Sequence, residues 1–285
     1  MKKLHLIYVF LLVFPLSFVA QEKAKDSVVD KPQRAAFESS YIIDTPTDVM
    51  PIKNTLEIQM GHRFGLVDGG TNDLIGFWAP SNIRIGLTYS FHDRVTLGYG
   101  TTKFDRLQDF NWKVGILRQT RSDKIPVNVT YFGNFTLDAR GKENFLVEQH
   151  RYSYFHQLII SRRFNPNFSF QIAPSISHYN LVPQRMPNDV VALSLGGRYK
   201  VSPQTAILVD YTHPFIHHLD GEELDMDPED GFSLGVEFRT SSHAFQLFIS
   251  SYQGIIPQKN IMFNQNDFFN GDFLIGFNIT RLYNF

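Results

Sequence analysis

The C-terminal stretch Phe273-Leu-Ile-Gly-Phe-Asn-Ile-Thr-Arg-Leu-Tyr-Asn-Phe285 alternates to the last residue and ends on an aromatic side chain. Counting from Phe273, every second residue except Arg281 is apolar or aromatic, and the residues between are mostly small or polar. Successive side chains of a β-strand point to opposite faces, so the stretch predicts a strand with one apolar and one polar face. Chain termini usually fray and face water, which makes a buried terminal Phe285 unexpected in a soluble protein. A lipid-facing strand that ends at a membrane interface accounts for it.

The apolar face of this stretch also resembles the C-terminal signal of outer-membrane barrels. Arg281 departs from the apolar residue that is usual at its position. The resemblance implies an outer-membrane location, with the barrel-assembly machinery as a partner. The residues that carry the resemblance are Phe277, Ile279, Tyr283 and Phe285.

The first twenty residues have the order of a secretory signal peptide. Lys2 and Lys3 precede an apolar stretch over residues 6–19, and Ala20 precedes Gln21, the expected first mature residue. An uncleaved anchor helix is the alternative, but the apolar stretch is shorter than the roughly 20 residues that a membrane span needs. We therefore expect a signal peptide over residues 1–20, and export.

The chain contains no cysteine among its 285 residues. Disulfides, a cysteine nucleophile, thiolate metal sites and a lipoprotein anchor are therefore excluded. The 27 Lys and Arg nearly balance the 28 Asp and Glu, so no polyanion such as nucleic acid is implied as a partner. No cofactor motif is present.

Residues 21–50 are predicted to form a periplasmic lead-in that is partly disordered or packs on the barrel. Its first part, residues 22–33, is charged and poor in large apolar groups. The part over residues 36–51 carries apolar side chains and two prolines. Three placements are open for it: a plug in the lumen, extra pairing at the barrel seam, or the periplasm.

Residues 51–285 predict an all-β fold, a transmembrane antiparallel up-and-down β-barrel of about 12 strands. Each alternating segment is near the ~10 residues that a tilted strand needs to cross a bilayer. A soluble β-sandwich also alternates, but its strands are shorter and its exposed faces carry more Lys and Glu. The expected strands are Thr55–Phe64, Asn82–Phe91, Arg94–Lys103, Asp109–Gln119, Pro126–Leu137, Arg151–Arg163, Asn167–Tyr179, Val190–Val201, Thr205–His213, Gly231–Arg239, Ala244–Tyr252 and Asp272–Phe285.

Short and long connections alternate between these segments. Outer-membrane barrels have short periplasmic turns and longer extracellular loops. An even number of strands then places both termini in the periplasm, and the last strand is expected to pair with residues 55–64. The expected short turns are His92-Asp93, Arg121–Lys124, Asn165-Pro166, Ser202-Pro203 and Ser241-Ser242.

Twelve strands ~4.8 Å apart and tilted by ~40° close into a cylinder roughly 24 Å across, which leaves a lumen on the order of 10 Å or less. Inward charged side chains can line a polar channel in such a barrel, or form a salt-bridged filling that seals it. Both alternatives stay open at this point. The lumen-lining candidates are Glu57, Arg84, Lys113, Arg151, Arg198 and Glu237.

The segment from His213 to Asp230 is the densest cluster of polar ligands. Carboxylates suit calcium and the histidines suit a transition metal, but neither set has a specific motif, so a solvated acidic outer loop is expected and no metal is predicted. Cations that bridge lipopolysaccharide are the alternative. The weak candidates are His217, His218, Asp225, Asp227 and Glu229.

Enzymatic activity is not expected. A membrane-embedded lipid hydrolase needs a serine activated by a nearby histidine, and the chain has no His-x-Ser pair. Gly-x-Ser-x-Gly occurs once, at Gly231–Gly235, within an expected strand. His156 lies on the outward phase, where an interfacial histidine is ordinary.

Four segments resemble an uncharacterised family of outer-membrane β-barrel proteins of Gram-negative bacteria, over roughly Phe37 to the C-terminus. The resemblance implies the architecture and no catalytic residues. We expect a monomer in contact with outer-membrane lipid and lipopolysaccharide. It is expected to act as a narrow channel or binding barrel for a small polar solute, or else as a sealed structural or surface-binding module. The segments are Gly61–Gly65, Ala79–Gly86, Arg151–Gln157 and Ala173–Asn180.

Overall fold

The computed structural model describes residues 30–218 and 224–285. The expected signal peptide over residues 1–20 and the first part of the lead-in lie outside the described residues. The fold below is that of residues 31–285.

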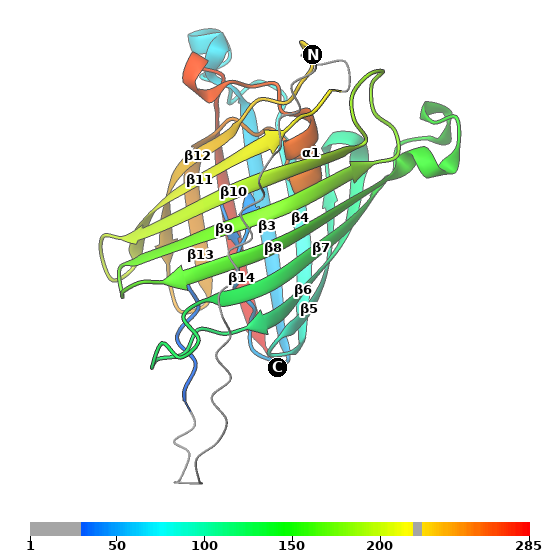
Figure 1. Cartoon of the computed structure of the whole chain (residues 1–285). Coiled ribbons are helices and arrows are strands. Elements are labelled where there is room, and N and C mark those ends of the chain that lie inside the picture. The colour runs from blue at the N-terminus through cyan, green and yellow to red at the C-terminus, as the bar shows by residue number, and fades with distance from the viewer. Residues whose placement is uncertain (1–29, 219–223) are drawn as a thin grey trace, which may run out of the picture. The chain divides into compact units, whose positions relative to one another are not determined.

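Twelve antiparallel strands form one closed barrel (Figure 1). Each strand pairs with its neighbours in sequence, and the last strand pairs with the first barrel strand in a register that sets Ile279 opposite Met60 and Tyr283 opposite Leu56. This confirms the predicted barrel, and no strand boundary differs from its expected position by more than two residues. The strands are β3 (Thr55–Leu66), β4 (Asn82–His92), β5 (Val95–Thr102), β6 (Leu107–Leu117), β7 (Asn128–Asp138), β8 (Tyr152–Arg163), β9 (Phe168–Tyr179), β10 (Asp189–Lys200), β11 (Thr205–Phe215), β12 (Gly231–Arg239), β13 (His243–Ser250) and β14 (Leu274–Asn284).

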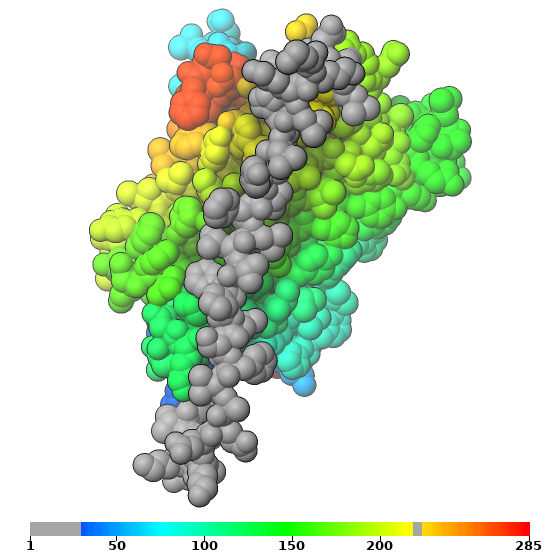
Figure 2. Space-filling view, in the orientation of Figure 1, coloured from blue at the N-terminus to red at the C-terminus, as the bar shows by residue number. Residues whose placement is uncertain are grey.

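Alternation separates the two faces of the wall. On β3, residues from Thr55 to Gly65 alternate strictly between buried inward positions and half-buried outward ones. Where it is in view, the outside of the wall is continuous from strand to strand (Figure 2). A closed sheet has no free edge, so every strand finds hydrogen-bond partners within the ring.

Exposed aromatic side chains on the outer face gather near the two ends of the barrel. Between them lie exposed aliphatic side chains, including Leu87, Ile172, Val209 and Leu247. An apolar band between two aromatic girdles matches the interfaces of a bilayer. The aromatics include Phe91, Phe168, Tyr199, Phe238 and Phe245 near the short turns, and Tyr154 and Phe215 near the long loops.

Short turns lie at one end of the barrel and longer loops at the other, as predicted, except that residues 103–106 between β5 and β6 form a short connection at the loop end. The loop between β7 and β8 projects far from the long-loop end, and the C-terminus lies at the short-turn end (Figure 1). One short connection, residues 118–127, is longer than expected because β6 ends before Gln119 and β7 begins after Pro126.

Several small elements complete the described chain. The lead-in forms a two-stranded hairpin of β1 (Tyr41–Ile42) and β2 (Thr45–Pro46), and the connection between β13 and β14 contains helix α1 (Pro257–Phe263). In the described residues, no helix has the length and apolar character to cross a membrane. The 3-10 helices are η1 (Val67–Asn72), η2 (Phe104–Arg106), η3 (Lys142–Asn144), η4 (Glu148–Arg151) and η5 (Phe268–Asn270).

Candidate functional site

The lead-in enters the barrel at its short-turn end. Lys31 and Gln33 bond through their backbones to the β6–β7 turn, where Gln33 N donates to Gln119 O at 2.8 Å and Arg121 N donates to Lys31 O at 3.0 Å. Residues 36–48 are then almost continuously buried. The sequence left three placements open for residues 36–51, and in the structure these residues lie in the lumen. We call residues 36–51 the plug.

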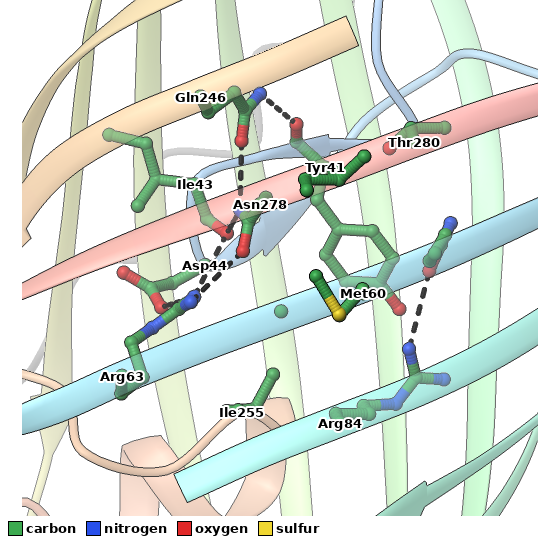
Figure 3. A pocket seen from close by; sticks show the side chains of 13 residues that line it. Tyr41, Ile43, Asp44, Met60, Arg63, Arg84, Gln246, Ile255, Asn278 and Thr280 are labelled. Atoms are coloured by element: carbon green, nitrogen blue, oxygen red, sulfur yellow. Dashed lines mark hydrogen bonds and ion pairs between the residues drawn. The ribbon is translucent and has the colours of Figure 1, made fainter. Parts of the chain in front are cut away.

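The tip of the plug is an aspartate bound by three strands. The Asp44 carboxylate accepts from Arg63 Nη2 on β3 at 2.9 Å (Figure 3). It also accepts from Ser233 Oγ on β12 at 2.7 Å and from Ser250 Oγ on β13 at 3.0 Å. Both charged side chains of this ion pair are buried, at 1% and 2% exposure. Ile43 has a φ of 68°, the left-handed turn that directs Asp44 toward these partners.

A second carboxylate holds the same turn from the wall. Asp210 on β11 accepts from the backbone N–H groups of Asp44 and Thr45, at 3.0 and 2.8 Å, and from Thr45 Oγ1 at 2.7 Å. Gln171 on β9 donates to Pro46 O at 3.0 Å. The turn is thereby bonded to both sides of the barrel.

The base of the plug is bonded to two glutamates and a lysine of the wall. Ser39 Oγ donates to Glu237 at 2.8 Å, and Ser40 Oγ donates to Glu57 at 2.7 Å. Lys113 Nζ donates to Ser40 O at 2.8 Å. Because β3, β6, β9, β11 and β12 all take part, the plug crosses the lumen rather than lining one side.

One carboxyl of the plug is only partly satisfied. Asp48 accepts from Ala36 N at 3.2 Å through one oxygen, and its other oxygen has no hydrogen-bond partner among the described residues. Burial raises the pKa of Asp48, and the Ala36 hydrogen bond opposes that rise.

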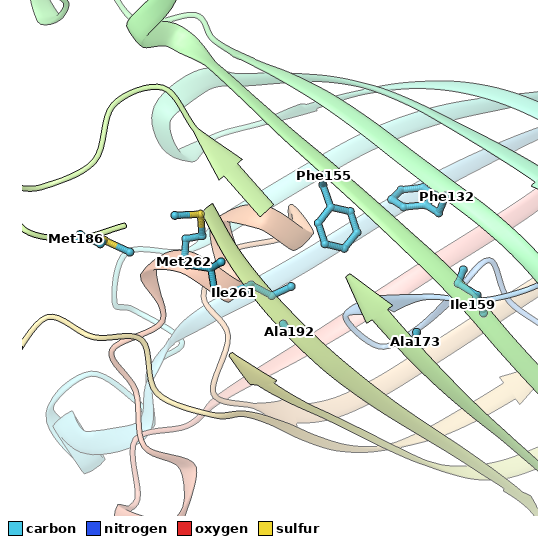
Figure 4. Close-up of a cluster of buried hydrophobic side chains, with 9 residues drawn as sticks. Phe132, Phe155, Ile159, Ala173, Met186, Ala192, Ile261 and Met262 are labelled. Atoms are coloured by element: carbon cyan, nitrogen blue, oxygen red, sulfur yellow. The ribbon is translucent and has the colours of Figure 1, made fainter. Parts of the chain in front are cut away.

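Large apolar side chains interrupt the polar inward face of the wall. They form two clusters, one around the plug and one that also includes Ile261 and Met262 of α1 (Figure 4). An apolar residue on the inward face of a strand has no lipid to contact, so it indicates that apolar groups fill the lumen. The sequence carries this signal, but we did not predict the filling from it. The interrupting residues are Phe132, Phe155, Ile159, Leu208 and Phe248.

Helix α1 enters the lumen from the long-loop end. Pro257 occupies its first turn, where a missing N–H costs nothing. Gln258 Nε2 donates to Asn134 Oδ1 at 2.9 Å and to Thr136 Oγ1 at 2.8 Å, both on β7. The plug and α1 therefore fill the barrel from opposite ends.

We expect Gln258→Leu to loosen α1, because it removes two buried hydrogen bonds to Asn134 and Thr136, each worth about 0.5–1.5 kcal/mol. Residues 254–266 should then exchange their amide hydrogens faster. Phe269→Leu, at a position of the same connection that is 76% exposed, is the control. Equal exchange in the two variants would contradict this anchoring.

Five of the six lumen-lining candidates lie on the inward face, and each has a polar partner. Arg84 donates to both oxygens of Asp109, each at 2.8 Å, and Arg198 donates to Glu237 at 2.9 Å. Sequence reasoning missed the acidic partners Asp44, Asp109 and Asp210, although Asp109 shares the inward phase of Lys113. The five are Glu57, Arg84, Lys113, Arg198 and Glu237.

The assignment of Arg151 to the lumen is corrected. Arg151 ends η4, just before β8 begins, and it donates to Asp138 O at 2.8 Å and to Glu148 at 2.9 Å. Its guanidinium also lies over the Phe145 ring. Arg151 thus belongs to the β7–β8 loop, where Asp138 also raises the pKa of Arg140.

The five metal candidates are not brought together. His218 Nε2 lies 2.8 Å from Asp227, but His217, Asp225 and Glu229 are exposed. Among the described residues, no group of three or more His, Asp or Glu side chains is placed to hold a metal ion.

The four residues of the C-terminal signal follow the outward phase of β14. Phe277 stacks on His62 of β3, Ile279 and Tyr283 are half-buried, and Phe285 is exposed. The inward side of the same strand carries Asn278, which donates to Ile43 O at 2.9 Å. Sequence reasoning missed this role in holding the plug.

Several hollows remain beside the plug, and three of them follow one another from the short-turn end to the long-loop end. The turn-end hollow (520 Å³) opens at the short turns, and the loop-end hollow (540 Å³) opens at the long loops. Between them, the middle hollow (40 Å³) is bounded by Tyr41 and Asp44 of the plug and by Arg63 and Arg84 of the wall (Figure 3).

The closed antiparallel ring, the outward apolar band and the aromatic girdles define a membrane-bound β-barrel. The chain belongs to the family described as "Membrane bound beta barrel domain (DUF5777)", which matches residues 37–283. This confirms the resemblance found in the sequence, and the barrel is of the outer-membrane type. No curated protein matches the chain.

Solved outer-membrane barrels are similar in fold. The NanC porin has a TM-score of 0.51 at 8% identity, covering 81% of this chain and 99% of that one. OmpT of Vibrio cholerae gives 0.42 at 11% identity, covering 83% and 100%. LpxR from Salmonella typhimurium gives 0.40 at 12% identity, covering 81% and 100%. The first of these likenesses supports the fold alone.

Proposed function

We propose that the protein is a narrow outer-membrane channel for small polar solutes, with a bore restricted by its own lead-in. The observation that carries the proposal is the plug, bonded across the lumen to a polar wall, with hollows left beside it. Solutes larger than these hollows are excluded while the plug is in place. The inward face is polar and its charges are paired. It can therefore face water wherever the plug and the wall lie apart.

A sealed barrel that binds partners through its long loops is the second candidate. The small volume of the middle hollow, 40 Å³, favours it. Conductance of the purified full-length protein in planar bilayers separates the two. Small, ohmic single-channel steps support the channel, and a folded protein that inserts without any current supports the sealed barrel.

We place the long loops outside the cell and both termini in the periplasm, in a monomer surrounded by outer-membrane lipid and lipopolysaccharide. The short-turn location of the C-terminus and the girdles support this orientation. The barrel-assembly machinery would recognise the outward residues of β14.

Single cysteines test this orientation cleanly, because the chain has none of its own. We expect Leu146→Cys, at a site 94% exposed in the β7–β8 loop, to react with a membrane-impermeant maleimide on intact cells. Gln204→Cys, at the β10–β11 turn, should react only after the outer membrane is permeabilised. The reverse labelling pattern would show that the long loops face the periplasm.

We also propose that the protein is not an enzyme. Ser242 Oγ lies 3.1 Å from His243 Nδ1, but these neighbours sit at a short turn, and no carboxylate among the described residues forms an ion pair with His243. A hydrolase of this type needs a third group to orient the imidazole. Release of fatty acid from phospholipid by the purified protein, lost in Ser242→Ala, would overturn this proposal.

A further inference from the structure

We infer that two connections at the long-loop end insert apolar side chains into the lipid leaflet beside them, and so extend the lipid-facing surface of the barrel. The two are residues 67–81, between β3 and β4, and residues 264–273, between α1 and β14. We call them the crest. The contact does not depend on conduction, so it goes beyond the proposed channel.

The two parts of the crest lie side by side at the long-loop end (Figure 1 and Figure 2). Val67 N donates to Phe273 O at 3.0 Å and joins their backbones. The crest contains four aspartates and neither lysine nor arginine, so attraction to anionic headgroups does not hold it on a membrane. Apolar contact has to do so.

Both parts of the crest fold over the outside of the wall. Phe64 lies on the outward face of β3, and the ring of Phe77 packs on it with 4.3 Å between the ring centroids. Phe232 lies on the outward face of β12, and the ring centroids of Phe268 and Phe269 are 4.7 and 5.4 Å from its own. The crest is therefore continuous with the lipid-facing surface of the barrel.

The wall beneath the crest does not reach the full height of an apolar band. On β3, outward residues run from Leu56, which lies opposite Tyr283 and Tyr89 near the short-turn end, to Phe64. This separation of eight residues is a rise of roughly 21 Å at ~3.4 Å per residue and a tilt of ~40°, and the apolar band of outer-membrane barrels is about 25 Å tall. Phe77 and its neighbours lie where the missing height is needed.

The same shortage recurs at β13, which has only eight residues. Just past its end, Ser251 N donates to Phe232 O at 3.0 Å, so the crest rings that pack on Phe232 lie where β13 stops. An apolar surface that is shorter than the bilayer core has to be matched by thinning of the bilayer or by flanking residues. The crest provides such residues beside the strands that need them.

The crest also exposes large apolar side chains. Trp78 and Phe269 are 72% and 76% exposed, and Leu74 and Ile75 are half-exposed. Leu74 and Ile75 have φ values of 54° and 56°, in the left-handed region that bulky side chains rarely adopt. In water such a turn is unfavourable twice, because it is strained and because it exposes apolar surface, and lipid contact removes the second cost.

The two tryptophans of the chain allow a direct test, because Trp78 lies in the crest and Trp112 lies on the outward face near the middle of β6. The full-length protein is folded into phosphatidylcholine vesicles whose acyl chains carry bromines, which quench tryptophan fluorescence on contact. In Trp112→Phe, we expect several-fold quenching of Trp78, strongest with bromines near the headgroup. In Trp78→Phe, quenching of Trp112 should be strongest with bromines near the chain ends.

A second reporter tests the other part of the crest. Phe269→Trp, in a chain that also carries Trp78→Phe and Trp112→Phe, should be quenched as Trp78 is. Leu146→Trp in the same background is the matched control, because Leu146 is also a highly exposed apolar residue but lies in the projecting β7–β8 loop (Figure 1). It should be quenched by iodide in the water and not by brominated lipid. Heat-modifiable electrophoretic mobility verifies that each variant is folded.

Three other outcomes would each overturn the inference. Iodide quenching at both crest positions that equals quenching at Leu146→Trp would place the crest in water. Protection from iodide and bromine alike would mean that protein, such as a second copy of the chain, covers the crest instead of lipid. Equal bromine quenching at Leu146→Trp would show that lipid contact is not particular to the crest. None of these results bears on conductance, so the proposed channel is tested separately.

Discussion

Deletion of residues 31–50 is expected to convert a small conductance into a much larger one. The plug bonds to inward groups on five or more strands, and without it Glu57, Lys113 and Asp210 face water across the lumen. The twelve-stranded ring closes through its own ladders, independent of the lead-in, so the barrel should still fold.

The measurement is single-channel conductance, joined by swelling of liposomes in small sugars. We expect a several-fold larger step and new permeability to sugars. Ile52→Ala, at an exposed position just beyond the plug, should change neither. A folded deletion variant with unchanged conductance would mean that α1, rather than the plug, closes the lumen.

The second large effect is expected from Asp44→Ala. Loss of this carboxylate leaves Arg63, Ser233 and Ser250 without their shared acceptor. Removing one partner of a buried ion pair costs about 3–5 kcal/mol. Water entry and relief of repulsion with the nearby Asp210 carboxylate offset part of this cost, so the tip of the plug should detach while the barrel persists.

We expect amide hydrogen exchange over residues 42–47 to be at least tenfold faster in Asp44→Ala, since about 1.4 kcal/mol corresponds to a factor of ten. Asp109→Ala is the matched control, because it removes an equally buried carboxylate whose hydrogen bonds are to Arg84, Asn111 and Asn134 of the wall rather than to the plug. If both variants speed exchange equally, Asp44 does not anchor the plug.

The barrel was predictable because alternation and turn chemistry are local. Each strand buries one face in lipid and turns the other inward, so the alternation of its residues shows where the strand begins and ends. An even number of antiparallel strands then predicts that β14 pairs with β3. The pairing of β14 with β3 needs no more than this, whereas the register that sets Ile279 opposite Met60 was not predicted.

The contents of the lumen were less predictable, because they depend on contacts between distant segments. α1 is seven residues long, too short for a helical period to be visible. Asp44 and Arg63 form an ion pair because the plug passes through the lumen beside β3, and their spacing in the sequence does not indicate this. The inward Phe132 and Phe155 did carry a local signal of filling. Arg151 was assigned to the lumen wrongly because it is the last residue of the β7–β8 loop, immediately before β8 begins at Tyr152.

Amide hydrogen exchange of the full-length protein in lipid tests the plug most directly. Thr45 N donates to Asp210, and Thr47 N donates to Ser40 O at 3.0 Å, deep inside the barrel. We predict that these two amides, with that of Asp44, exchange as slowly as the amides of β10 and β11. Exchange at the rate of an unstructured peptide would show that the lead-in lies outside the lumen and would contradict the account.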